Sequence, residues 1–311
     1  MITERMLNEA VSLLTDCKKS FELSCTADDA RELIEKLRNE RMILFHLGTV
    51  NYKYYPFQRR TVFYPDYHYS KEEYEYLISL LSDKVRNIKA QVMRKKSDLE
   101  KEYFIHDFFA KNVRYEDTGV DSHSIVGPLI YGRGVCDGIS KSAKVLFGEC
   151  GIECHVVNGT SRNSENGRLE PHSWNIVKID GMYYHLDITY DNCASDEGIC
   201  YDYFNLSSDE IYKDRVNSEP SRFYHIKCIK ENDYFIMNSC YFTDIWQVEN
   251  YCKINLASRK KLLYFRVSKD ISEQSVKNTV TACLKAINCR ISYNISVNST
   301  RNVFRWEIEY K

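Results

Sequence analysis

The chain has 311 residues, of which 43% are hydrophobic and 28% charged, and its formal net charge is -1. This composition is that of an ordinary globular protein, and it excludes wholesale disorder, collagen-like repeats and coiled-coil rods. Because basic and acidic residues balance, the electrostatic footprint of a non-specific nucleic-acid binder is absent, and we expect no nucleic-acid partner.

No stretch approaches the roughly 18 consecutive apolar residues that a membrane span requires, and residues 1–10 lack the apolar region of a signal peptide. We therefore expect a cytoplasmic protein with no membrane contact, although a chain that had lost an export signal would look the same. In that compartment the twelve cysteines are expected to be reduced thiols, most of them packed in the core.

Residues 1–70 predict an accessory β-α-β-β unit, here called the N-terminal cassette. After an opening amphipathic helix the pattern predicts a strand, a helix that Thr26 caps, and two strands joined by a hairpin connection, at residues 21–25, 27–37, 42–55 and 61–69. Residues 256–311 predict the same order and form the C-terminal cassette, with elements at 262–267, 271–287, 290–297 and 303–310. Whether the cassettes pair into one sheet, form two lobes or are alike by chance stays open.

The central region, residues 71–255, holds the densest group of chemically active side chains. Two helices at 71–96 and 99–112 precede a turn-rich segment that ends in Gly132-Arg133-Gly134-Val135. Cys136 then opens a helix that Gly151 closes. Free N–H groups and the positive end of the helix dipole favour the thiolate there, so Cys136 is placed to be a nucleophile. Its amide is one candidate oxyanion donor, and Tyr115 or Tyr131 could supply another.

Downstream, two alternating runs are joined by Asp180-Gly181, a strong signal for a two-residue hairpin turn. That turn sets a register in which His172 lies opposite Thr189 and Trp174 lies opposite Asp187. His172 and Asp187 then share one face as diagonal neighbours, about 7 Å apart at Cβ, close enough for the carboxylate to accept the ring N–H. The spacing therefore predicts the histidine–carboxylate half of a catalytic triad.

The same register places the other side chains of this hairpin. The opposite face is apolar and is expected to pack on the Cys136 helix or its neighbours; it comprises Val177, Ile179, Met182, Tyr184, Leu186 and Ile188. His185 falls on the face of His172, opposite Ile176, where we expect a supporting or surface role. Trp174 is a candidate substrate contact, but a place in the core is the simpler interpretation.

Three motifs in this region resemble those of the transglutaminase-like superfamily, which also contains bacterial cysteine peptidases and peptide N-glycanases. They are Gly134-Val135-Cys136-Asp137-Gly138, His172-Ser173-Trp174-Asn175 and Asp187-Ile188-Thr189. Flanking segments, among them Asp202-Tyr203-Phe204-Asn205, extend the resemblance over residues 99–208. Ile139 and Ser173 depart from the residues that many members carry, an aromatic and an alanine.

The resemblance implies an α+β protein with a papain/transglutaminase-like core, in which the Cys helix packs on an antiparallel sheet. It assigns Cys136 as nucleophile, His172 as base and Asp187 as orienting acid, with no cofactor. The implied reaction is acyl transfer at an amide of a protein or peptide substrate, and hydrolysis is favoured because the bacterial peptidase branch is the nearer match. Alternatives are a cross-linking transglutaminase and a catalytically silent fold that binds a protein partner. The oligomeric state is not predicted.

Two further patterns receive plain interpretations. Cys150, Cys154 and His155 could suggest a metal site, but no second pair has the spacing of a zinc knuckle, since six residues separate Cys193 from Cys200. We therefore expect no metal. The polar residues 161–170, which include Asn163, Ser164, Asn166 and Gly167, predict a surface loop, with a lid as the alternative.

Overall fold

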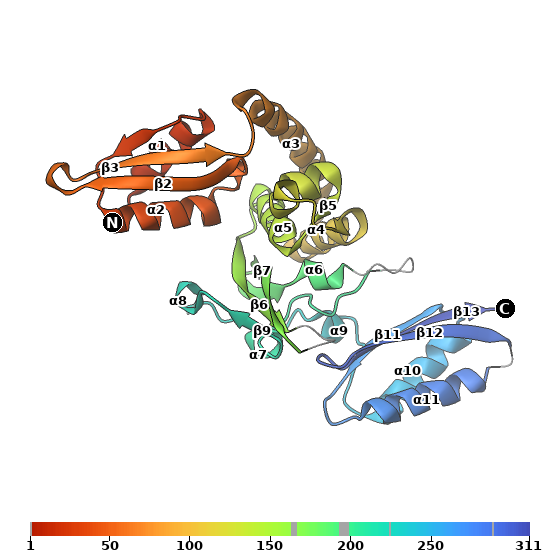
Figure 1. Ribbon diagram of the computed structural model, residues 1–311. Helices are drawn as coiled ribbons and strands as arrows, with labels where there is room; N and C mark the ends of the chain where they lie inside the picture. The colour runs from red at the N-terminus through yellow and green to blue at the C-terminus, as the bar shows by residue number, and fades with distance from the viewer. Residues whose placement is uncertain (1, 163–166, 193–198, 224, 288) are drawn as a thin grey trace. The chain divides into compact units, whose positions relative to one another are not determined.

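The computed structural model describes residues 2–162, 167–192, 199–223, 225–287 and 289–311 (Figure 1). The chain divides into two compact units, Met1–Val156 and Val157–Lys311. The domain boundaries expected after residues 70 and 255 stay predictions. Asn163, Ser164, Asn166 and Cys193, considered above for a loop and a metal site, lie outside the described residues.

The N-terminal cassette has the predicted β-α-β-β order. It comprises α1 (Glu4–Thr15), β1 (Phe21–Leu23), α2 (Ala27–Glu40), β2 (Leu47–Tyr55) and β3 (Arg60–Tyr67). The strands form an antiparallel sheet in the order β1-β3-β2. Thr26 begins α2 through a capping box, because its hydroxyl accepts the Asp29 N–H while the Asp29 carboxylate accepts the Thr26 N–H.

Three helices make up most of the remainder of the first unit: α3 (Lys71–Val92), α4 (Asp98–Asn112) and α5 (Cys136–Glu149). The three helices pack on one another and contact the N-terminal cassette. The Lys144 ammonium donates to the carbonyl of Asn39 at 3.0 Å, and the Tyr74 ring stacks on the buried His46 ring at 3.8 Å. The expected helices and the closure of α5 by Gly151, at φ +77°, are confirmed.

The second unit is built on a sheet ordered β8-β7-β6-β9. Its strands are β6 (Cys154–Arg162), β7 (Leu169–Ile179), β8 (Met182–Leu186) and β9 (Arg215–Asn217). Asp180 and Gly181 both have positive φ, at 50° and 83°, as the hairpin turn requires. The predicted register is confirmed from Ile179 opposite Met182 to Asn175 opposite Leu186.

The ladder stops there, so two predicted pairings, His172 with Thr189 and Trp174 with Asp187, are wrong. The reason is local. The Asp187 side chain accepts the N–H of Tyr190 and caps α6 (Ile188–Asp191), which turns the chain out of the sheet.

Both faces of the β7–β8 hairpin are largely buried. On the face predicted to be apolar, Met182 is 49% exposed and the other strand residues are buried. The opposite face is covered as well, since Trp174 and Ile176 belong to a buried cluster that also contains Val157, Tyr203, Leu206, Ile211, Phe223 and Cys228. His185 is only 1% exposed, so a surface role for it is wrong.

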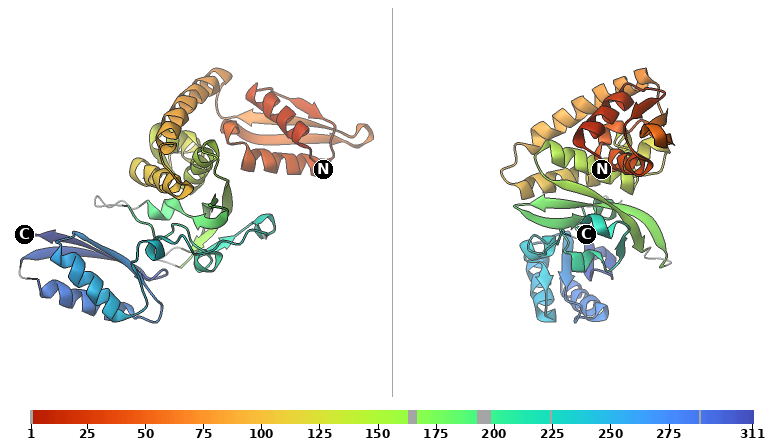
Figure 2. Two further views of the ribbon diagram at one scale, coloured as in Figure 1. Left: turned by 180° about the vertical axis from the view of Figure 1, so that it is seen from behind. Right: turned by 90° about the vertical axis from the view of Figure 1, so that its left-hand side faces the viewer.

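The C-terminal cassette forms a separate four-stranded sheet ordered β10-β11-β13-β12. Its elements are β10 (Tyr241–Phe242), α10 (Ile245–Ala257), β11 (Leu262–Val267), α11 (Glu273–Lys285), β12 (Ile291–Asn298) and β13 (Val303–Tyr310). Helices α10 and α11 lie side by side on one face of this sheet (Figure 2). The order β11-β13-β12 repeats β1-β3-β2, so the predicted repeat is confirmed in topology, and the cassettes do not share a sheet.

Three short helices connect these parts: α7 (Ser208–Ile211), α8 (Pro220–Phe223) and α9 (Tyr234–Met237). Within the described ranges no helix has both the length and the apolar character needed to cross a bilayer. Among the cysteines that the structure describes, ten are free thiols, as expected, whereas Cys200 is disulfide-bonded and departs from that expectation.

Two glycines of α5 provide a matched test of packing. A Cβ at Gly138 would lie 2.2 Å from the carbonyl oxygen of Ser122, whereas a Cβ at Gly148 would meet nothing within 4 Å. We expect Gly138→Ala to lower the free energy of unfolding by about 1–3 kcal/mol through overpacking. Gly148→Ala should raise it by about 0.5–1 kcal/mol, since alanine is the better helix former. Urea unfolding followed by circular dichroism measures both, and equal effects would contradict the assigned packing.

Candidate active site

Cys136 is the first residue of α5 and is partly exposed. The N-cap residue, Val135, has an extended backbone and provides no side-chain cap for the helix. The first hydrogen bond of the helix runs from the Ile139 N–H to the carbonyl of Val135 at 2.9 Å. The sulfur therefore sits at a helix start whose N–H groups no side chain caps, which is the environment predicted from the sequence.

The segment before α5 holds this helix start in place. Gly132 adopts a left-handed conformation at φ +65° and turns the chain into β5 (Arg133–Gly134). This strand pairs in parallel with β4 (Arg114–Tyr115) and so sets Tyr115 beside Gly134. The N–H of Val135 donates to the carbonyl of Ser122 at 3.0 Å. Tyr115 and Tyr131 are 55% and 48% exposed, and a role for either as oxyanion donor stays a prediction.

A cavity of about 580 Å³ opens beside the start of α5, within the first unit. Its walls come from the N-terminal cassette, the segment around residues 119–125 and the first turn of α5. The charged residues among them are Arg38, Arg41, Asp137 and Lys141, with apolar side chains such as Leu44 and Val120 between. Asp137 and Lys141 form an ion pair at 2.7 Å one helical turn apart. Both signs of charge therefore line the cavity, with cations in excess.

His172 and Asp187 lie together in the second unit. His172 Nε2 is 2.7 Å from Asp187 Oδ2, and the two side chains are 4% and 0% exposed. The ring of Tyr190 meets the His172 ring edge-on, with centroids 5.2 Å apart. The proximity of the two residues that the hairpin spacing predicted is thus confirmed, although the ladder does not extend to them.

Asp187 is held ionised in spite of its burial. Burial alone would raise its pKa, but the neighbouring His172 and the Arg215 guanidinium lower the pKa of this carboxyl to about 2. Arg215 donates from Nε and Nη2 to Asp187 Oδ2, at 3.1 and 2.9 Å. Because the carboxylate can only accept, His172 Nε2 carries the proton between them, and the ring is fixed in one tautomer.

Trp174 lies behind the histidine. It is fully buried, its ring is stacked with the His172 ring at 6.1 Å, and its indole N–H donates to His185 Nδ1 at 3.0 Å. This is a core position, and the substrate contact suggested for Trp174 stays a prediction. Burial and the nearby positive charge of Arg301 lower the pKa of His185 to about 3, so its ring is neutral at physiological pH.

Arg215 is the residue of this site that sequence reasoning missed. It lies on β9, is 2% exposed, and its guanidinium packs over the rings of Tyr190 at 3.9 Å and Tyr203 at 4.5 Å. No periodicity or motif links it to Asp187, since the two elements meet only through the sheet. Among the described residues, no group of three or more His, Cys, Asp or Glu side chains is arranged to hold a metal ion.

A family model described as the transglutaminase-like superfamily matches residues 86–188. That range contains Cys136 at the start of α5, His172 on β7 and Asp187 at the start of α6. Residues 86–188 are therefore similar to the transglutaminase-like superfamily. Within this transglutaminase-like region, Cys136 lies in the first compact unit, whereas His172 and Asp187 lie in the second.

Several solved structures are similar to parts of this chain at low sequence identity. One is a TGase structure, which is 15% identical in sequence and has a TM-score of 0.33. The match covers 57% of this chain and 51% of the TGase chain. A second is a proposed cysteine protease from Cytophaga hutchinsonii, with 13% sequence identity and a TM-score of 0.31. This match covers 45% of this chain and 61% of the protease chain. A third is a proposed protease from Parabacteroides distasonis, with 16% sequence identity and a TM-score of 0.28. This match covers 44% of this chain and 28% of that protease chain. The chain thus spans less than two thirds of each. A search of curated proteins found no match.

The neutral state of His185 predicts a pH dependence of stability. Its pKa is near 3 when folded and about 6.5 when unfolded, so the unfolded chain takes up the proton first. The stabilisation is complete above the unfolded value and is lost as the pH falls, by about 1.4 kcal/mol per unit between 6.5 and 3. His185→Gln keeps an acceptor for Trp174 and should flatten this dependence in urea titrations.

The control for that titration is His155→Gln, because His155 is only partly buried and its ring contacts the carboxylate of Glu153. This variant should keep the wild-type slope. If the two variants have the same pH dependence, His185 is not held neutral in the folded protein.

Proposed function

We propose that this protein is a thiol-dependent acyltransferase that acts on amide bonds, with Cys136 as nucleophile, His172 as general base and acid, and Asp187 as the residue that orients the ring. The observation that carries the proposal is the buried 2.7 Å contact between His172 and Asp187, in the same transglutaminase-like region as an uncapped helix start bearing a cysteine. Asp187 engages Nε2, which makes Nδ1 the nitrogen that would meet the thiol.

The reaction follows from these groups. His172 takes the thiol proton, and the Cys136 thiolate attacks the amide carbonyl carbon and forms a C–S bond. As the C–N bond breaks, the imidazolium gives its proton to the leaving amine, and a thioester remains on the enzyme. A water molecule then attacks the thioester carbonyl while His172 accepts its proton. The C–S bond breaks, the carboxylic acid leaves, and His172 returns the proton to the Cys136 sulfur. The negative charge of Asp187 stabilises the imidazolium at each stage.

Water is the acceptor we favour, which makes the enzyme a cysteine peptidase or amidase. A thioester is attacked by whichever nucleophile reaches it, and water far exceeds any amine in concentration. A lysine amine as acceptor would instead make the enzyme a cross-linking transglutaminase. A chain that keeps these side chains only to bind a protein partner is the third possibility, and the experiments below separate the three.

The substrate we propose is a protein or peptide. The cavity lined by Asp137 and Lys141 of α5, at about 580 Å³, is within the size range of small-ligand sites and can hold one or two side chains of an extended segment. Arg41 is paired with Glu4 and Lys141 with Asp137, so the excess positive charge of the lining is that of Arg38, which favours an acidic side chain in that segment.

Selective alkylation tests the nucleophile without knowledge of the substrate. At about pH 6 a thiol paired with a histidine and a helix start should react with iodoacetamide at least about tenfold faster than ordinary thiols. Cys17 and Cys289 are suitable internal comparisons because they are also only partly buried. Mass spectrometry of peptides after timed labelling gives the three rates.

The same assay examines the histidine and the acid. His172→Gln and Asp187→Asn should bring the rate at Cys136 down toward that of Cys289, since the base is lost or its tautomer is released. Labelling of Cys136 at the rate of Cys289 in the wild-type protein would favour the silent, partner-binding alternative.

Turnover is tested with a fluorogenic library of peptide amides that includes acidic sequences. Cys136→Ala should lower kcat/KM by about 10³-fold or more, while Cys289→Ala leaves it unchanged. A fluorescent primary amine added to the same reactions reports the acceptor. Cleavage without amine incorporation supports hydrolysis, incorporation that exceeds cleavage supports cross-linking, and activity that survives Cys136→Ala is incompatible with the mechanism.

A further inference from the structure

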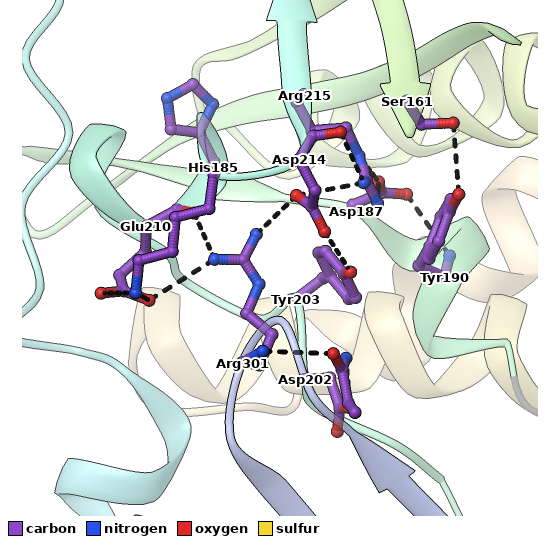
Figure 3. Close-up of polar contacts among 12 residues, drawn as sticks. Ser161, His185, Asp187, Tyr190, Asp202, Tyr203, Glu210, Asp214, Arg215 and Arg301 are labelled. Carbon is purple, nitrogen blue, oxygen red and sulfur yellow. Dashed lines mark hydrogen bonds and ion pairs between the residues drawn. The ribbon is translucent and has the colours of Figure 1, made fainter. Parts of the chain in front are cut away.

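A chain of buried charges runs from the proposed orienting acid to the C-terminal cassette (Figure 3). It consists of Asp187, Arg215, Asp214 and Arg301, and is called here the charge chain. Arg301 belongs to the loop between β12 and β13, yet its side chain is 0% exposed. A loop residue of an accessory cassette that is this deeply buried needs a specific partner, because an arginine is almost never buried unless paired.

The acidic partners of Arg301 are Asp214 and, at the longer distance of 3.4 Å, the Glu210 carboxylate. Arg301 Nη2 donates to Asp214 Oδ1 at 2.9 Å, and Arg301 Nη1 donates to the carbonyl oxygen of Glu210. Arg215 Nη1 lies 3.2 Å from the same oxygen of Asp214, and the hydroxyl of Tyr203 donates to the other oxygen at 2.7 Å. One carboxylate therefore holds two guanidinium groups at once.

Arg215 completes the connection to the proposed triad. Its two contacts with Asp187 Oδ2 place that oxygen between a guanidinium and the His172 ring. Along the charge chain the signs alternate, so each group is stabilised by its neighbours and moving one alters the next. If Arg301 were absent, Asp214 would balance Arg215 alone, and Arg215 would shift from Asp187 toward Asp214.

The loop that carries Arg301 is itself anchored. Asn298 accepts the N–H of Arg301 through its side chain and donates to Asp202 Oδ2 at 2.8 Å. Asp202 also accepts the hydroxyl of Tyr264 on β11, at 2.5 Å. The next residue, Tyr203, accepts the backbone N–H of Asp187 through its carbonyl, at 3.1 Å. The C-terminal cassette thus supports the Asp187 side chain through the charge chain, and it supports the Asp187 backbone through Asp202 and the adjacent Tyr203.

We propose that Arg301 is a positioning residue for the His172–Asp187 pair, so that the C-terminal cassette is a working part of the active site and not a separate accessory. The inference rests on the proposed roles of His172 and Asp187. Arg301 acts through Asp214 and Arg215 and does not itself touch the reacting atoms.

The direct readout is the tautomer of His172, followed in full-length, ¹⁵N-histidine-labelled protein by long-range ¹H–¹⁵N correlation spectra and assigned with His172→Gln. In wild type the neutral ring should be the Nε2–H form. In Arg301→Met the Nδ1–H form should appear, because Asp187 no longer holds the ring in one orientation. Arg301→Lys keeps the charge but loses the two-pronged contact, and it should show an intermediate shift.

The matched control is Arg266→Met. Arg266 also lies in the C-terminal cassette and forms a buried ion pair, with Asp233 at 2.6 Å, but this pair is not part of the charge chain. The control should lose stability in thermal unfolding yet keep the wild-type tautomer of His172. Should Arg301→Met fail to fold, Arg301→Lys and Tyr203→Phe, which removes one hydrogen bond to Asp214, carry the test. An unchanged tautomer in folded variants at position 301 would overturn the proposal.

Alkylation of Cys136 at about pH 6 separates this inference from the proposed function. A drop of about tenfold in Arg301→Met, with no drop in Arg266→Met, supports both. A tautomer change in a protein whose Cys136 is unreactive even as wild type supports the positioning role and removes the enzyme assignment. If Cys136 is reactive in the wild type, and Arg301→Met changes neither its alkylation rate nor the tautomer of His172, the proposed function stands and the proposed role of Arg301 is wrong.

Discussion

The buried carboxylate of Asp187 is the group on which the contacts around the β7–β8 hairpin depend. One oxygen ends the β7–β8 ladder by capping α6 at Tyr190, and the other binds His172 and Arg215. A carboxylate that is 0% exposed stays charged only with a full set of partners, and a buried guanidinium has the same need. Asp187 therefore requires Arg215, and Arg215 requires Asp214 and two tyrosine rings. The burial of this one carboxylate therefore requires a connected series of buried partners in the second unit.

Local chemistry explains what the sequence could predict. Asp180-Gly181 specifies a turn with two positive φ angles, the turn specifies the register, and the register brings His172 near Asp187. The approximate placement survived although the ladder ended early, because Asp187 directly follows the last paired residue. Arg215 and Arg301 could not be predicted in this way. They reach the site through strand order and through a loop of another cassette, and no short-range pattern encodes either.

The two cassettes share strand order but use their hairpin loops differently. In the N-terminal cassette the loop between β2 and β3 presents Phe57 fully to solvent, at 103% exposure. The corresponding loop between β12 and β13 buries the side chain of Arg301, which is 0% exposed, against Asp214. The shared topology therefore sets where each loop lies on its own sheet. The side chain in the loop decides whether the loop is exposed to solvent or packs against another part of the protein.

The two histidines of the hairpin show that burial alone does not assign a role. His172 and His185 are 5% and 1% exposed, and both rings lie next to Trp174. They differ in the sign of the nearest partner. His185 accepts a hydrogen bond from the Trp174 indole and lies near the positive charge of Arg301, so its protonated form is disfavoured, whereas His172 donates a hydrogen bond to the Asp187 carboxylate. The arginine that suppresses charge on one ring is thus the arginine that, through Asp214 and Arg215, holds the acid beside the other.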